Sequence, residues 1–190
     1  MGHVTGLIYC LDLGVACGVA YGRPGDVPKS GTVRLKKKGE AIDMAFANLV
    51  AFLADEFNRE RPALIIKEKM LALQAFMAMG NAESTVRAHA GYHAIVEAMS
   101  VRFGIPWDEV ADSTARKHFI GIGRTGDREE TKRAVVARCH ALKLMPADCS
   151  DDNRADALAI HDWACANFGS RAASIQNFQL FEQAGGRKHG

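Results

Sequence analysis

Three short β-forming segments near the start of the chain restrict its fold most strongly. Residues 6–13 (GLIYCLDL), 15–22 (VACGVAYG) and 29–35 (KSGTVRL) are separated by glycine and proline turn signals. Short strands that follow one another this closely predict an antiparallel meander. The fold must therefore contain a sheet that begins with these three strands.

A helix and a fourth strand extend this sheet. Apolar residues recur at helical spacing over 40–60, and ALIIKE at 63–68 is a compact, apolar strand segment. A strand reached through a helix is expected to lie parallel to the first strand. The later segments predict helices at 82–103 and 128–143, a strand at 107–111, a helix capped by Ser113 or Thr114, and a last helix at 151–168 capped by Ser150.

This order predicts an α/β fold with a mixed sheet flanked by helices. We expect a single domain over residues 1–170 and a polar tail at 171–190. Five scattered cysteines without a C-x-x-C pair indicate reduced thiols rather than a zinc site. The N-terminus has no secretory pattern, so the expected location is cytoplasmic.

Two acids end core strands of this predicted sheet. Asp12 shares a strand face with Ile8 and Cys10, and Glu68 ends the strand LIIKE. If the two strands are parallel neighbours, both carboxylates meet at one end of the sheet, where a divalent cation would offset their repulsion. The alternative is that each acid pairs with a nearby Lys or Arg, although the adjacent Lys67 and Lys69 should point to the opposite face from Glu68.

A second group of acids begins the last predicted helix. Asp152, Asn153 and Asp156 are placed so that the first two lie beside Asp156 on one helix face. Asp152 also suits the helix dipole, whereas Asp156 lies in the second turn, where the dipole does not account for it. Three or four such carboxylates are the ligands that Mg²⁺ or Mn²⁺ prefers, and can hold two ions for phosphodiester hydrolysis.

The net charge of +2 conceals strong segregation. Residues 29–38 hold five Lys/Arg and no acid, and residues 113–145 hold eight Lys/Arg against three acids. Residues 148–162 instead hold five Asp against one Arg. Basic flanks around an acidic centre suit a polyanion that is bound at a cation-bearing site, and exposed helix faces are the simpler explanation for either basic stretch alone.

Five motifs, in order, resemble the RuvC-type Holliday-junction resolvases, especially their phage-borne relatives. LDLGVACGVA (11–20) is similar to the first-strand motif, and LIIKE (64–68) to the motif with the second acid. The other three are FMAMGNAES (76–84), STARKHFIGIGRTGD (113–127) and DDNRADALAI (151–160). The resemblance runs from about Gly6 to Phe168, which is most of the chain.

The resemblance implies an RNase H-like fold with a five-stranded mixed sheet, a homodimer, and two Mg²⁺ per site, with Mn²⁺ able to substitute. It implies catalytic roles for Asp12, Glu68 and Asp156. Arg116 and Lys117 fall where the family contacts DNA, and Phe76 falls where an aromatic ring stacks on an unpaired base. The basic residues expected to contact DNA further along are Arg124, Arg128 and Lys132.

Two departures from the family pattern leave questions open. The family's third acid corresponds to Asn153, so either the Asn153 amide oxygen or the carboxylate of Asp152 would fill that catalytic and metal-binding position. The spacing between Glu68 and Phe76 is longer than in the bacterial proteins, and Phe76 could instead belong to the core or a dimer interface.

Three candidate functions are consistent with the sequence. The first is a nuclease that resolves four-way DNA junctions, without a nucleotide cofactor or membrane partner. The second is an RNase H-fold nuclease for other branched DNA, RNA–DNA hybrids or structured RNA, and the third is a catalytically silent junction-binding protein. His89, His93 and Glu97 also form a helical stripe that could bind metal, for which a polar helix face or a dimer contact is the simpler explanation.

Overall fold

The computed structural model describes residues 3–70, 83–121 and 127–169. Its five strands form one mixed sheet in the order β3-β2-β1-β4-β5. These strands are β1 (Ile8–Asp12), β2 (Ala16–Gly22), β3 (Lys29–Arg34), β4 (Leu64–Glu68) and β5 (Trp107–Val110). The expected α/β, RNase H-like architecture is confirmed.

The sheet topology matches the expected one at both of its decisive pairings. β1 pairs antiparallel with β2, which pairs antiparallel with β3, so the predicted meander is present. β4 runs parallel to β1, and β5 runs parallel to β4. The carboxyl ends of three adjacent strands, β1, β4 and β5, therefore lie at the same edge of the sheet.

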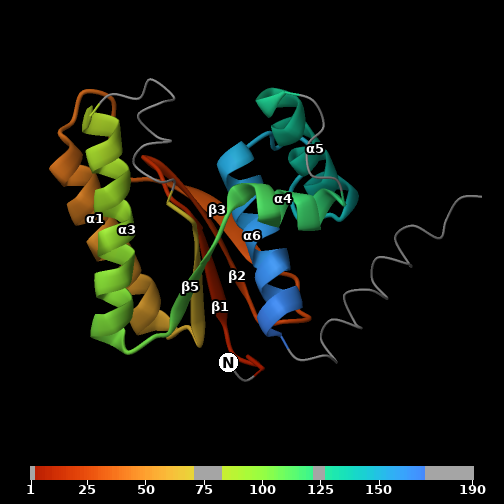
Figure 1. The fold of residues 1–190 in the computed structure, drawn as a ribbon, viewed down its shortest axis with the longest axis horizontal. Helices are drawn as coiled ribbons and strands as arrows, with labels where there is room; N and C mark the ends of the chain where they lie inside the picture. The colour runs from red at the N-terminus through yellow and green to blue at the C-terminus, as the bar shows by residue number, and fades with distance from the viewer. Residues whose placement is uncertain (1–2, 71–82, 122–126, 170–190) are drawn as a thin grey trace, which may run out of the picture.

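Helices cover both faces of the sheet (Figure 1). α1 (Ile42–Arg59) and α3 (Glu83–Phe103) pack on one face. The other face carries α4 (Asp112–Ile120), α5 (Arg128–Ala141) and α6 (Asp152–Phe168). Alternation along β1 supplies both cores: Tyr9 and Leu11 face the α1–α3 layer, whereas Ile8 and Cys10 face the α6 layer.

Two helix starts differ from the sequence-based predictions. α4 begins at Asp112, after Ala111 at the N-cap, and not after Ser113 or Thr114. α6 is capped by Asp151, whose side chain accepts the backbone N–H of Arg154, and not by Ser150. Both observed caps lie within three residues of the predicted ones. Local capping preference does not fix the first residue of a helix more closely than this.

Close contact between β2 and α6 fixes the start of that helix. A Cβ added at Gly18 would lie 2.0 Å from the carbonyl oxygen of Asn153, so only glycine permits this approach. Gly18 is also paired with Asp12 across the β1–β2 ladder. The contact thereby places the first turn of α6 over the end of β1.

We expect Gly18→Ala to lower the free energy of unfolding by about 2 kcal/mol or more, because backbone must shift to admit the methyl group. This corresponds to a fall in Tm of roughly 4 °C or more for a chain of this size. Gly31→Ala is the matched control in β3, since nothing lies within 4 Å of a Cβ built there. Equal Tm values for the two variants would contradict the close contact.

Three other expectations concern the chain as a whole. All five cysteines are free thiols. Among the described helices, none is both long and apolar enough to cross a membrane. The tail at 171–190, Phe76 and Arg124 lie outside the described residues.

Candidate metal centre

Parallel pairing of the two central strands brings Asp12 and Glu68 together. The β1–β4 register pairs Leu11 with Lys67, so the next position places Asp12 beside Glu68. The Glu68 Oε1 accepts the backbone N–H of Leu13 at 2.9 Å, which anchors its carboxyl group to the loop after β1. The two acids singled out from the sequence thus share one end of the sheet.

Asp112 completes this group, although the sequence-based reasoning did not single it out. It is the first residue of α4 and follows β5, whose Val110 pairs with Glu68. Carboxylate oxygens of Asp12, Glu68 and Asp112 all lie within 4.8 Å of one another. The signal that could have identified Asp112 is its place after a third parallel strand, whose carboxyl end must reach the same edge of the sheet.

Asp156, on α6, lies beside the cluster formed by Asp12, Glu68 and Asp112. It is only 6% exposed, and its two carboxylate oxygens accept hydrogen bonds from Nε and Nη2 of Arg116 at 2.8 and 2.7 Å. The same guanidinium lies 3.4 Å from Asp112. The positive charge of Arg116 therefore partly neutralises Asp156 and Asp112, and its side chain is directed into the site.

Burial and mutual repulsion raise the pKa values of Asp12 and Glu68, so full ionisation of the cluster is unfavourable. Burial raises the pKa of Asp12 well above its ordinary value, and the charges of Glu68, Asp156 and Asp112 raise it further. Burial, followed by the charge of Asp112, raises the pKa of Glu68 to about 8. The Glu68 carboxyl also shares a side-chain hydrogen bond with Asp112. Hard oxygen donors with unbalanced charge are a suitable ligand set for Mg²⁺ or Mn²⁺.

The two other predicted ligands on α6 lie differently. The Asp152 carboxylate forms a hydrogen-bonded ion pair with Lys132 of α5, and this hydrogen bond lowers the pKa of Asp152. Asn153 contributes its backbone carbonyl to the close contact with Gly18. Among the described residues, the acid that joins Asp12 and Glu68 in the three-carboxylate group is Asp112 rather than Asp152.

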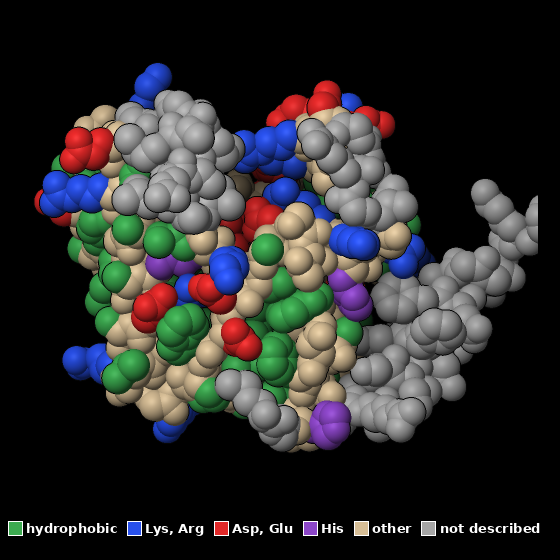
Figure 2. Space-filling view, in the orientation of Figure 1, with side chains coloured by type: hydrophobic (Ala, Val, Ile, Leu, Met, Phe, Trp, Pro, Cys, Tyr) green, Lys and Arg blue, Asp and Glu red, His purple; other side chains and the backbone are tan. Residues whose placement is uncertain are grey.

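The predicted DNA-contacting residues are divided between the site and its rim. Arg116 is bound to Asp156, and Lys132 is bound to Asp152. Lys117 and Arg128 are exposed. Figure 2 shows a hollow between the helical layers, with acidic side chains at its floor and Lys and Arg side chains on the α5 side.

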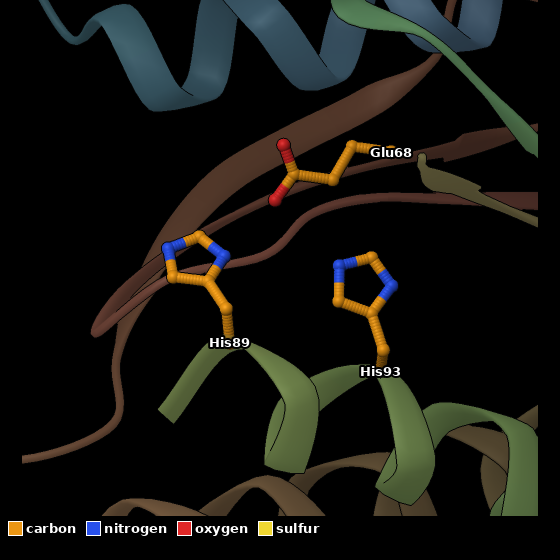
Figure 3. A group of neighbouring side chains, drawn as sticks. All are labelled: Glu68, His89 and His93. Carbon is orange, nitrogen blue, oxygen red and sulfur yellow. The ribbon is translucent and has the colours of Figure 1, made fainter. Parts of the chain in front are cut away.

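The histidine stripe of α3 approaches the same glutamate from the opposite side. His89, His93 and Glu68 offer ligand atoms within 4.8 Å of one another, and their side chains face a common space (Figure 3). Glu97, the third member of the predicted stripe, instead lies 3.2 Å from the Nζ atom of Lys67. Lys67 points away from the acid cluster, as its strand position predicted.

The raised pKa values predict a pH-dependent response to Mg²⁺. A carboxyl group whose pKa rises on folding binds a proton that the unfolded chain has released, so stability falls as pH increases, here from about 4.5 to 8 for Glu68. Mg²⁺ bound to the ionised cluster removes this penalty. We therefore expect Mg²⁺ to raise Tm by at least a few degrees more at pH 8 than at pH 6.5, measured by calorimetry.

That comparison separates the acids from the other titrating groups. His118 gains stability from its ion pair with Asp162, which raises its pKa, and this contribution also declines above pH 6.5. This contribution does not depend on Mg²⁺. It therefore cancels when, at each pH, the Tm without Mg²⁺ is subtracted from the Tm with Mg²⁺. An Mg²⁺ effect of equal size at both pH values would contradict the metal centre.

Comparisons with known proteins extend this description. No protein-family model matches the chain, and no curated protein matches its sequence. The solved structure of Thermus thermophilus RuvC in complex with a Holliday-junction substrate is similar, with a TM-score of 0.58 and 16% identity over 84% of this chain and 95% of that one. A second structure of Thermus thermophilus RuvC gives 0.58 at 18% identity, with the same coverage.

A eukaryotic structure shows the same likeness. The yeast mitochondrial Holliday junction resolvase Ydc2 matches with a TM-score of 0.51 and 11% identity, over 98% of this chain and 86% of that one. At these identities the likeness establishes the fold. Two proteins of one fold type thus align with 84% and 98% of this chain.

Proposed function

We propose that this chain, which has the fold of the RuvC-type junction resolvases, is a metal-dependent endonuclease that resolves four-way DNA junctions. One observation carries the proposal. The carboxylates of Asp12, Glu68 and Asp112 converge at the carboxyl ends of three adjacent strands. A protein that only bound DNA would gain nothing from concentrating acids where phosphate must lie.

The oxygen donors of this cluster suit Mg²⁺, for which Mn²⁺ would substitute, and we propose two ions per site. Asp12, Glu68 and Asp112 would hold the metal, and Asp156 lies beside them. Bound there, the metal would supply an activated water and stabilise the charge of the leaving oxygen. The chain's own part is to keep these oxygens close together in a half-buried site.

Arg116 has a positioning role in this proposal. Its two hydrogen bonds hold the Asp156 carboxylate in one orientation, and its charge offsets that of the neighbouring acids. The resemblance suggested a DNA contact for this residue. Since its guanidinium is bound within the site, the adjacent and exposed Lys117 is the better candidate for contact with a phosphate.

DNA would lie across the hollow of Figure 2, with its phosphates against the basic rim. Arg128 and Lys132 on α5, with Lys117 on α4, would contact the backbone and hold the strand over the acids. Arg124 and Phe76 keep the roles proposed from the resemblance. Paired cuts at symmetric positions require two sites at a fixed spacing, so we further propose a homodimer.

The test is cleavage of three labelled substrates: a four-way DNA junction, a linear duplex of the same sequence, and an RNA–DNA hybrid. Each is incubated with the full chain in Mg²⁺, with EDTA as the control. We expect paired, symmetric nicks in the junction that require Mg²⁺. Cleavage mainly of the hybrid or duplex would retain a nuclease but reject the junction. Tight junction binding without any cleavage would identify a silent binder.

A further inference from the structure

The side of Glu68 that faces α3 contains a histidine whose environment is unusually well defined. His93 is 4% exposed, and it lies on the same helix face as His89, four residues earlier. Figure 3 shows both rings directed toward the space beside the Glu68 carboxyl. One ring nitrogen of His93 lies within 4.8 Å of a Glu68 oxygen.

Lys67 determines which nitrogen of His93 carries the proton. Its Nζ atom lies 3.1 Å from Nδ1 of His93, and it forms ion pairs with Glu109 at 2.9 Å and Glu97 at 3.2 Å. An ammonium group can only donate hydrogen bonds, so Nδ1 must accept. The proton of the neutral imidazole is therefore held on Nε2.

That Nε2–H group has no partner in the described structure. The Nε2 atom is buried and makes no hydrogen bond. A buried donor without an acceptor is costly, so a partner for this group is expected. The carboxylate of Glu68, in the same group of atoms, is the strongest acceptor within reach.

In the structure Glu68 makes its hydrogen bonds with other groups. One of its oxygens accepts the Leu13 N–H, and its carboxyl group is hydrogen-bonded to Asp112. A divalent ion held by Asp12, Glu68 and Asp112 would compete with the hydrogen bond between Glu68 and Asp112. The Glu68 carboxylate would then be free to turn and accept a hydrogen bond from His93.

We infer that His93 is a positioning residue, which Lys67 holds as the Nε2–H tautomer so that it can orient Glu68 for metal binding. The inference rests on the proposed role of Glu68 as a metal ligand. It also predicts that His89, His93 and Glu68 do not form a metal site of their own. A ligating nitrogen must offer a lone pair, and the nitrogen of His93 that faces Glu68 is protonated.

The test measures Mn²⁺ affinity of the full chain by calorimetry, in the absence of DNA. We expect His93→Leu to weaken Mn²⁺ binding by about 10- to 100-fold, as is typical when a group that orients a ligand is removed. His93→Gln should stay within about threefold of wild type, because its amide can donate from a similar position. Tm values of the metal-free variants verify that both fold.

Two spectroscopic measurements on the wild-type chain test the inference even if a variant does not fold. We expect ¹⁵N NMR to show His93 protonated at Nε2 and unprotonated at Nδ1. We expect pulsed EPR of bound Mn²⁺ to show no coupling to a histidine nitrogen.

The contradicting outcomes are distinct. Equal Mn²⁺ affinity in wild type and His93→Leu, the opposite tautomer, or a nitrogen coupling that disappears in His93→Gln would each overturn the positioning role. In the last case His93 would be a ligand. No Mn²⁺ binding by the wild-type chain would overturn the proposed function, and this inference with it.

Discussion

Asp12→Asn is expected to lower the rate of junction cleavage by at least about 10³-fold. Asp12 ends the central strand and lies within 4.8 Å of two further carboxylates, so its loss removes the acid shared by the whole cluster. If metal contributes about 4 kcal/mol to stabilising the transition state, its loss gives a decrease of this size. The measurement is the single-turnover rate on a labelled four-way junction in saturating Mg²⁺.

The same variant should bind the junction as tightly as wild type or more tightly, because one negative charge near the phosphates is removed. Asp55→Asn is the matched control, since Asp55 is an exposed acid on α1 and undergoes the same chemical change. Cleavage by Asp12→Asn at the wild-type rate would remove the acid cluster from the reaction.

Asp112→Asn is expected to lower cleavage by about 10²-fold or more, whereas Asp152→Asn should change it by less than about threefold. The reason is their different placement. Asp112 belongs to the three-carboxylate group, and Asp152 forms an ion pair with Lys132. Both variants are assayed under the single-turnover conditions used for Asp12→Asn, with Tm measured to confirm folding.

This pair of variants decides which residue replaces the acid that the resemblance places at Asn153. A severe loss in Asp152→Asn together with near-normal activity in Asp112→Asn would move the third ligand back to α6. Adding an acid by Asn153→Asp provides a further check. If Asp112 already fills the role, the added acid should not increase the rate.

The position of the site could be predicted from strand patterns alone. Period-two alternation placed Asp12 and Glu68 on core-facing positions at strand ends, and the helix between their strands required a parallel pairing. Both inferences depend on local pattern and on the tendency of a helix between two strands to serve as a crossover that leaves them parallel. The same alternation correctly directed Lys67 away from Asp12 and Glu68. Its Nζ atom instead pairs with Glu109.

The identity of the third carboxylate depended on packing that local sequence does not encode. Asp112 could have been found from the parallel pairing of β5, but Ser113 and Thr114 are common helix-capping residues and suggested a later helix start than the one after Ala111. The pairing of Arg116 with Asp156 joins residues 40 positions apart on different helices. Helix spacing cannot predict such a contact.

The α3 stripe illustrates the same limit. Spacing of four residues correctly placed His89 and His93 on one helix face, but it also included Glu97. Which acid completes the group depends on how α3 lies across the sheet. In the structure Glu97 meets Lys67, and Glu68 at the end of β4 meets the histidines.

The most direct test of the metal centre is a crystal of the full chain soaked in Mn²⁺ and measured for anomalous scattering. We predict a strong anomalous peak bounded by the carboxylates of Asp12, Glu68 and Asp112, and its loss in crystals of Asp12→Asn. A peak held by His89 and His93 alone, or no peak near these acids at saturating Mn²⁺, would contradict a nuclease centre at this edge of the sheet.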